Sequence, residues 1–381
     1  MNIAVVGAGA AGLFLSKLLS ETGNCNIHIF ERTGKPGYKV KASGGGKANI
    51  LNTKISGECY NNAAFIANLL SRADYQTIYH EFEKMGLKMS VDEENRVYPN
   101  TFFSQTVLDV LLNGISDLVQ FHYNTEVQQI NRKGIHYYIN NEAMPFDAIV
   151  LASGSPAGMI AKNRKHFDRY LTDFNISRKE YKPSLVGFKL EDYPMSLSGC
   201  RCKAICSLYQ KDKLIYQEAG EVTFKDDGAS GIVILNLSAY YNRLKDKKDC
   251  AVGFNFMYDD ADYNVAEHLR KYGSLCGLIH PKLNRLYERN PFDVKDLRFK
   301  IKDTYELEFA QVCAGGIAVR EINDDFELKK YPKVYAIGEM IDIDGVCGGY
   351  NLFFAWASAY LCAQSLSLQA SVYRNSSIQC K

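Results

Sequence analysis

The first thirty-one residues constrain the fold of this chain more than any other segment. Asn2–Val6 is a short run rich in β-branched residues, typical of a strand that is buried on both faces. It leads directly into Gly7-Ala8-Gly9-Ala10-Ala11-Gly12, a G-x-G-x-x-G motif, and Leu13–Leu19 continues as an apolar helix-like segment. A second strand, Ile27–Phe30, is followed by the acid Glu31. This order predicts a βαβ unit that binds a dinucleotide.

Each glycine of the motif has a different expected task. Gly7 permits the tight turn, Gly9 lets the backbone approach a pyrophosphate, and Gly12 lets the helix pack on the strand. The helix N-terminus, with Ala10 and Ala11, would meet the negative phosphates. Glu31, followed by Arg32, can accept hydrogen bonds from a ribose diol, which favours FAD or NAD over NADP.

Composition and charge exclude several classes of protein. The chain has 381 residues, of which 46% are apolar and 23% charged, so it is neither disordered, collagen-like nor a small disulfide scaffold. A net charge of +2 provides no overall field for nucleic acid or an anionic membrane, and we expect neither partner. Eleven cysteines, an odd number in a chain of this size, favour reduced thiols and a cytoplasmic location.

A long stretch without charged residues lies near the C-terminus, at residues 345–373. Its strongly apolar part, Leu352–Ala363, is too short to cross about 30 Å of hydrocarbon. We therefore interpret it as a buried helix rather than a membrane span.

A glycine-rich loop follows the predicted βαβ unit. Three consecutive glycines, Gly44, Gly45 and Gly46, stand between Ser43 and Lys47. Backbone amides in such loops can surround a phosphate or the edge of a flavin ring, although a plain surface loop is the alternative. Lys39 and Asn49, on either side of the glycines, join Ser43 and Gly44–Gly46 as candidate cofactor ligands.

A second segment, near the C-terminus, carries a family resemblance. Val334–Glu339 ends a predicted strand in Gly-Glu, and Asp342–Leu352 follows. Residues Gly338–Leu352 match a G-E-x-x-D-x-D-G-x-x-G-G-Y-N-L pattern, and the chain thereby resembles the BaiN-like (YhiN-like) family of bacterial FAD-dependent oxidoreductases. Weaker matches to that family fall in order along the chain, at Arg96–Pro99, Pro183–Phe188, Gly228–Gly231 and Ala310–Gly316.

The resemblance implies an α/β protein whose Rossmann-like FAD-binding domain is split in sequence. It would comprise residues 1–182 and 314–381, with Phe146–Gly154 as the strand that returns beneath the cofactor through Ala152 and Gly154. A β-barrel-like inserted domain would span 183–238 and 291–313, and would carry a helical subdomain at 239–290. The expected strands of the insert are Ser184–Phe188, Cys200–Tyr209, Leu214–Tyr216, Ile232–Leu235 and a return within 293–310.

The C-terminal segment supplies the remaining candidate cofactor residues. Gly338, Glu339 and Asp342 would contact the ribityl–pyrophosphate region of FAD. The turn that opens the uncharged helix would direct its N–H groups and its positive dipole end at the flavin. Its residues are Gly348, Gly349, Tyr350, Asn351 and Leu352.

The chain departs from the family pattern at three places. Lys47 and Ala48 stand where the family usually has Arg and Cys, and Asp226 stands where it commonly has His. Residues 155–166 replace a long glycine-rich stretch of the family. These differences leave the cofactor assignment in place and weaken any assignment of substrate.

Cysteines at even spacing, Cys200, Cys202 and Cys206, indicate one face of a strand rather than a metal site, and we expect no metal.

No second G-x-G-x-x-G follows a strand between residues 100 and 330, so NAD(P)H, if it is the reductant, would dock transiently over the flavin.

The leading functional hypothesis is an FAD-dependent oxidoreductase that passes hydride from NAD(P)H through flavin to an enone-like small molecule, the reaction that the resemblance implies. The alternatives are an oxygen-using oxidase of an amine, an FAD-dependent RNA-modifying or RNA-binding protein, and a flavin-bearing redox sensor or scaffold. Catalytic residues are not identified; Tyr38, Lys39 and Lys47 are candidates because their loop should lie near the ring. The oligomeric state is not predicted.

Overall fold

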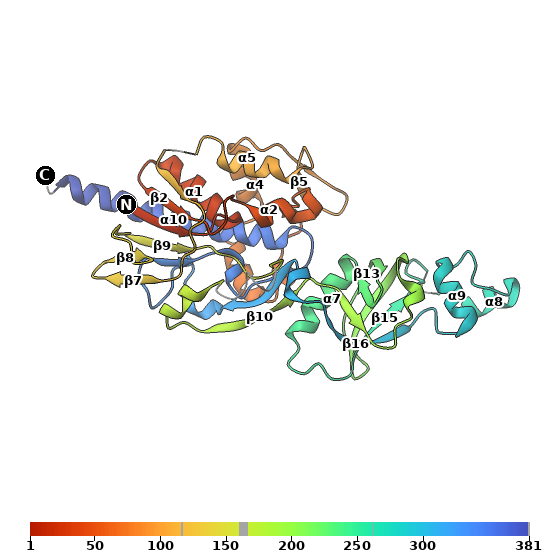
Figure 1. Ribbon diagram of the computed structural model, residues 1–381. Helices are drawn as coiled ribbons and strands as arrows, with labels where there is room; N and C mark the ends of the chain where they lie inside the picture. The colour runs from red at the N-terminus through yellow and green to blue at the C-terminus, as the bar shows by residue number, and fades with distance from the viewer. Residues whose placement is uncertain (116, 160–166, 261, 380–381) are drawn as a thin grey trace. The chain divides into compact units, whose positions relative to one another are not determined.

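The computed structural model describes residues 1–115, 117–159, 167–260 and 262–379 (Figure 1). The chain divides into two compact units, each of which is described by itself. Unit 1 comprises residues 1–156, 160–181 and 315–381, and unit 2 comprises residues 157–159 and 182–314.

Unit 1 is built on a five-stranded sheet with the order β18-β9-β1-β2-β6. All four strand pairs are parallel, and the central strand, β1, is almost wholly buried, as its β-branched sequence predicts. The strands are β1 (Asn2–Val6), β2 (Asn26–Phe30), β6 (Val119–His122), β9 (Ala148–Leu151) and β18 (Val334–Ala336).

Helices and small sheets complete unit 1. An antiparallel three-stranded sheet joins β3 (Leu51–Asn52), β5 (Arg96–Pro99) and β4 (Met89–Val91), and β7 (Ile130–Lys133) pairs with β8 (His136–Ile139). The helices of eight or more residues are α1 (Ala10–Thr22), α3 (Ala63–Leu70), α4 (Tyr75–Lys84), α5 (Ser104–Leu112) and α10 (Tyr350–Gln379). The short helix α2 (Tyr38–Ala42) precedes the glycine loop.

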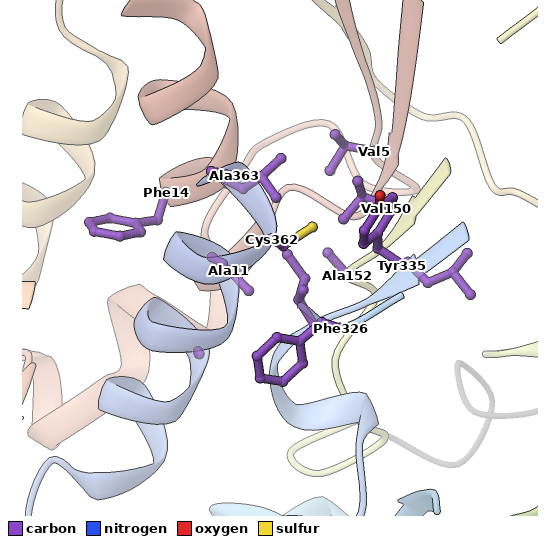
Figure 2. Close-up of a cluster of buried hydrophobic side chains, with 14 of the residues drawn as sticks. Val5, Ala11, Phe14, Val150, Ala152, Phe326, Tyr335, Cys362 and Ala363 are labelled. Carbon is purple, nitrogen blue, oxygen red and sulfur yellow. The ribbon is translucent and has the colours of Figure 1, made fainter. Parts of the chain in front are cut away.

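Two helices, α1 and α10, pack beside each other on the central strands. Figure 2 shows Cys362 of α10 beside Val150 and Tyr335 of the sheet, while the ring of Phe14 in α1 lies 5.4 Å from that of Trp356 in α10. The uncharged C-terminal stretch is therefore a buried helix, as predicted, because both the sheet and α1 cover its apolar side chains. No helix in the described part of the chain is long and apolar enough to cross a membrane.

A pair of histidines lies within the sheet. His28 of β2 is 5% exposed, and its Nδ1 lies 3.0 Å from Nε2 of His122 on β6. Burial, and then the neighbouring His122, lower the pKa of His28 from its ordinary value of 6.5.

This pair predicts a loss of stability in mild acid. Above pH 6.5 His28 is neutral in both states, whereas below it the unfolded chain takes up a proton that the folded chain resists. The free energy of unfolding should therefore fall as the pH drops below 6.5, as urea denaturation at pH 7.5 and 5.5 can measure. His28→Leu should reduce this fall, because it removes the group that the folded chain keeps neutral. Equal pH dependence in His28→Leu and the wild type would contradict the assignment.

Unit 2 is a closed six-stranded barrel with the order β11-β14-β13-β12-β15-β16 (Figure 1). Its strands are β11 (Phe188–Leu190), β12 (Arg201–Gln210), β13 (Lys213–Phe224), β14 (Gly228–Ser230), β15 (Cys250–Asn255) and β16 (Leu297–Thr304). All neighbouring strands pair antiparallel, and a turn at Lys211-Asp212, both with positive φ, joins β12 to β13. The α-helices in the described part of unit 2 are α7 (Ile232–Arg243), α8 (Val265–Tyr272) and α9 (Pro281–Arg289).

Three local predictions in unit 2 are wrong. Ile232–Leu235, expected as a strand, begins helix α7, because the apolar run continues with helical spacing through Leu237 and Tyr241, which are buried. Cys250–Asn255, expected within a helical segment, is barrel strand β15. The expected strand Ser184–Phe188 is broken, since Leu185 has φ +54° between β10 (Arg178–Ser184) and β11.

The broader expectation is confirmed: the protein has an α/β fold with a Rossmann-like sheet and a β-barrel. Strand β10 pairs with β17 (Val312–Ile317), and the boundary between the units crosses both strands. The functional labels of the domains and the helical subdomain at 239–290 stay predictions. The unusual segment 155–166 lies partly outside the described residues, from residue 160 onward.

Candidate functional site

The candidate site lies where the parallel strands of unit 1 end. Strands β1, β2, β9 and β18 run in the same direction, so their carboxyl ends meet at one edge of the sheet. The segments that follow them begin at Gly7, Glu31, Ala152 and Ile337. The later strands β2 and β6 lie on one side of β1, and β9 and β18 lie on the other, so the order of the strands reverses at β1. Doubly wound sheets bind nucleotides at such a switch point.

Gly7 and Gly12 lack room for a side chain. A Cβ at Gly7, whose φ is +109°, would lie 2.6 Å from the carbonyl oxygen of Ala152. A Cβ at Gly12 would collide with the carbonyl oxygen of Gly7. Gly12 therefore lets α1 pack closely on the end of β1, as predicted, and Gly7, predicted to permit the tight turn, also lets the segment after β9 come close.

Gly9 differs from both neighbours in the motif. It is the N-cap of α1 with φ −84°, and a Cβ built there has no atom of the described chain within 4 Å, its chain neighbours aside. Neither backbone strain nor packing requires glycine at this position. The open space lies at the N-terminus of α1, whose first turn, Ala10–Leu13, carries no acidic side chain, and this arrangement accepts an anion.

Glu31 is held firmly beside this space. One carboxylate oxygen accepts the N–H of Ala8 at 3.0 Å, and the other accepts the N–H and hydroxyl of Thr33 at 2.9 and 2.8 Å. The oxygen that accepts from Ala8, Oε2, keeps one further lone pair, because each carboxylate oxygen has two. Glu31 is thereby oriented at the end of β2 and can still accept a hydroxyl of a ribose.

A second polar cluster joins three distant segments of unit 1. The ammonium of Lys39 lies 2.6 Å from Oε2 of Glu339, and the hydroxyl of Ser155 donates to Oε1 at 2.6 Å. Lys39 Nζ also lies 3.4 Å from Ser155 Oγ. Sequence reasoning missed Ser155, and its place just after the strand-end segment Ala152–Gly154 is the one signal that could have indicated it.

The glycine loop is open on its outer side. Gly44, Gly45 and Gly46 all have positive φ, between 56° and 88°, which glycine alone adopts without strain. A Cβ at Gly45 or Gly46 would meet no described atom within 4 Å. Ser43 donates its hydroxyl to the carbonyl of Val40, at 2.7 Å, which fixes the start of the loop.

The start of α10 is tied to the end of this loop. In the amide orientation that satisfies both groups, Asn49 accepts the N–H of Gly349 at 3.1 Å and donates to Leu51 O at 3.0 Å. A Cβ at Gly349 would collide with the carbonyl of Leu51, so close packing requires this glycine. The side-chain amide of Asn351 closes the preceding turn. Its oxygen accepts the N–H of Gly345 and its nitrogen donates to the carbonyl of Gly345, each at 2.9 Å.

Asp342 has interactions within the protein. Its Oδ2 lies 2.6 Å from the ammonium of Lys179, and its Oδ1 accepts the N–H of Gly315 at 3.1 Å. The carboxylate is buried, and the bonds connect the turn before α10 to strands β10 and β17. This geometry gives Asp342 a structural task, and a contact with cofactor stays a prediction.

The structure brings together most of the predicted residues but not all of them. One group of predicted residues lies at the sheet edge: the motif glycines, Ala10, Ala11, Glu31, Lys39, Ala152, Gly154, Gly338 and Glu339. A second group belongs to the neighbouring glycine loop and the start of α10: Ser43, Asn49, Gly348, Gly349 and Tyr350. Tyr38 is 73% exposed and Lys47 is exposed, with no ion pair found for Lys47 among the described residues. Arg32 lies over the ring of Phe167 at 5.9 Å, and Leu352 packs against the core.

The chemistry of this edge fits FAD. It offers an open helix N-terminus for a pyrophosphate, a fixed carboxylate for a ribose and an amide-rich glycine loop. No group of three or more metal-binding side chains occurs in the residues that the structure describes.

Comparison with known proteins agrees with this geometry. The family described as "HI0933-like protein Rossmann domain" matches residues 1–365. The chain belongs to this family. The resemblance to BaiN-like FAD-dependent oxidoreductases inferred from the sequence is therefore confirmed, and with it the flavin cofactor.

Two curated relatives align with nearly the whole chain. A 3-dehydro-bile acid Δ(4,6)-reductase of Clostridium scindens is 25% identical, over 96% of this chain and 98% of its own. A ribosomal RNA dihydrouridine synthase of Escherichia coli is 24% identical, over 95% and 97%. Among solved structures, a 3-ketosteroid Δ1-dehydrogenase of Sterolibacterium denitrificans aligns with 96% of this chain and 99% of its own, with 12% identity and a TM-score of 0.49.

Proposed function

We propose that this FAD-dependent oxidoreductase reduces a carbon–carbon double bond conjugated with a carbonyl group in a small molecule. We further propose that NAD(P)H supplies the hydride to the flavin. The observation that carries the proposal is the open sheet edge at Gly9, Glu31 and the glycine loop, in a chain of this family.

The names of the two relatives support this class of reaction. A Δ(4,6)-reductase and a dihydrouridine synthase are both named for the addition of hydrogen across a double bond. In a conjugated carbonyl compound the β-carbon accepts hydride and the α-carbon accepts a proton. The shared chemistry, rather than either substrate, is what we carry over to this chain.

The residues of unit 1 would bind and orient the cofactor. The N–H groups at the start of α1 would hold the pyrophosphate, Glu31 the ribose, and the loop Ser43–Gly46 would close over the flavin. FAD, when reduced, supplies the hydride. Tyr38 and Lys47, both exposed beside the loop, are candidate donors of the proton.

Anaerobic mixing tests the proposal. The purified protein should retain or bind FAD, and NADH or NADPH should bleach the flavin absorbance. An enone should then restore the absorbance, with one enone reduced for each flavin reoxidised. If only an amine bleaches the flavin, and oxygen alone restores it, the protein is an oxidase and the proposal is wrong.

An RNA substrate is the second candidate, favoured by the dihydrouridine synthase relative. The C5–C6 double bond of uridine is conjugated with the C4 carbonyl, so the same hydride chemistry would apply. We expected no nucleic-acid partner because the net charge is only +2. Incubation of reduced protein with ribosomal RNA, followed by analysis of nucleosides for dihydrouridine, distinguishes the two substrates.

A further inference from the structure

The strongest unexplained feature of unit 1 is the ion pair between Lys39 and Glu339. It joins α2 to the segment after β18, and the two residues lie 300 positions apart in sequence. The Glu339 side chain is 20% exposed and that of Lys39 is 36% exposed. A half-buried pair with a 2.6 Å contact loses less to solvent screening than a surface pair.

The pair lies beside the open helix N-terminus. Gly37, which precedes α2, donates its N–H to the carbonyl of Ala8 at 2.8 Å. On the other side, a Cβ at Gly338 would lie 3.0 Å from the Cβ of Ala11, in the first turn of α1. The backbone next to each partner of the ion pair thus lies close to the segment between Gly7 and Gly12.

The negative charge of Glu339 is unfavourable beside a site for pyrophosphate. A pyrophosphate diester carries two negative charges at neutral pH, and a bare carboxylate near it would oppose binding. Lys39 removes this opposition, because its ammonium neutralises Oε2 while Ser155 donates to Oε1. Both carboxylate oxygens of Glu339 are therefore held in place, one by the ion pair with Lys39 and the other by the hydrogen bond from Ser155.

We propose that Lys39 is a positioning residue for FAD: its ammonium neutralises Glu339 and holds it against Ser155, so that the sheet edge accepts a doubly negative pyrophosphate. Lys39 acts through Glu339, and this task differs from direct catalysis. The inference rests on the binding of FAD to unit 1.

A double-mutant cycle tests the role of Lys39. FAD affinity is measured by titration of the apoprotein, using flavin fluorescence, for the wild type, Lys39→Met, Glu339→Gln and Lys39→Met/Glu339→Gln. We expect Lys39→Met to weaken FAD binding about tenfold or more, because it leaves Glu339 uncompensated. In the Glu339→Gln background the same change should weaken binding less than about threefold, because no charge remains to neutralise.

Two control variants show whether the effect belongs to the Lys39–Glu339 pair. Lys41→Met removes a charge from the same helix and should leave FAD affinity unchanged, and Lys39→Arg should keep affinity close to that of the wild type. Thermal denaturation of each apoprotein identifies a variant that fails to fold; in that case Lys39→Arg and the double variant carry the comparison.

Two results of the cycle would overturn the proposed role. If Lys39→Met binds FAD as the wild type does, the ion pair has no task in binding. If Lys39→Met weakens binding equally in both backgrounds, Lys39 contacts the cofactor itself and does not act through Glu339. Failure of the wild type to bind FAD would instead contradict the cofactor assignment.

Discussion

Replacement of Gly9 by valine should abolish FAD binding while the apoprotein remains folded. The structure leaves a Cβ at this position free of contacts within 4 Å, and φ of −84° suits any residue, so the folded chain tolerates the side chain. The valine would occupy the space through which the helix N-terminus meets the pyrophosphate. We expect a loss of affinity of at least ~100-fold, or about 2.7 kcal/mol.

Two comparison variants show whether the effect is specific to binding. Gly12→Val should prevent folding, since its Cβ would collide with the Gly7 carbonyl, whereas Gly9→Val should melt within a few degrees of the wild type. Gly134→Asn adds a side chain in an open turn with φ +62°, where asparagine is tolerated, and should change neither property. Unchanged flavin content in purified Gly9→Val would contradict the assignment of this edge.

The positions that the sequence predicts well are those where the local pattern and the tertiary environment agree. Strand β1, helix α1 and strand β2 follow from residues 2–31 because β-branched residues, glycines and an apolar helix occur in a fixed order. The buried helix at the C-terminus follows from its lack of charge.

The places where prediction fails are those where short-range pattern is ambiguous. Ile232–Leu235 has the composition of a strand, and only the burial of Leu237 and Tyr241, farther along, shows that its period is helical. Strand β15 was not predicted, because it is short and joins the barrel through long-range pairing with β12 and β16.

The candidate site shows the same division. The tasks of the motif glycines were predictable one by one, and the tight packing at Gly7 and Gly12 and the open space at Gly9 agree with them. By contrast, Lys39, Ser155 and Glu339 are far apart in sequence, and only the folded chain brings them together.

Replacement of Trp356 by alanine should destabilise unit 1 more than any other single truncation considered. Trp356 is fully buried in α10, with its ring 5.4 Å from that of Phe14 and 5.3 Å from that of Phe82. Its indole N–H donates to the carbonyl of Ile50 at 3.1 Å, which ties the end of the glycine loop to the helix. Loss of the ring should cost about 3–5 kcal/mol, a large part of the stability of a typical domain.

Urea denaturation followed by circular dichroism measures this effect, because Trp356 is the single tryptophan and its fluorescence is lost in the variant. Trp356→Phe keeps most of the ring but leaves the buried Ile50 carbonyl without its donor, and should cost about 1–3 kcal/mol. Leu368→Ala, on the same helix but 71% exposed, should change stability by less than about 0.5 kcal/mol. Equal stabilities for Trp356→Ala and Leu368→Ala would mean that α10 does not hold the core, and the buried, uncharged character of this helix would need another cause.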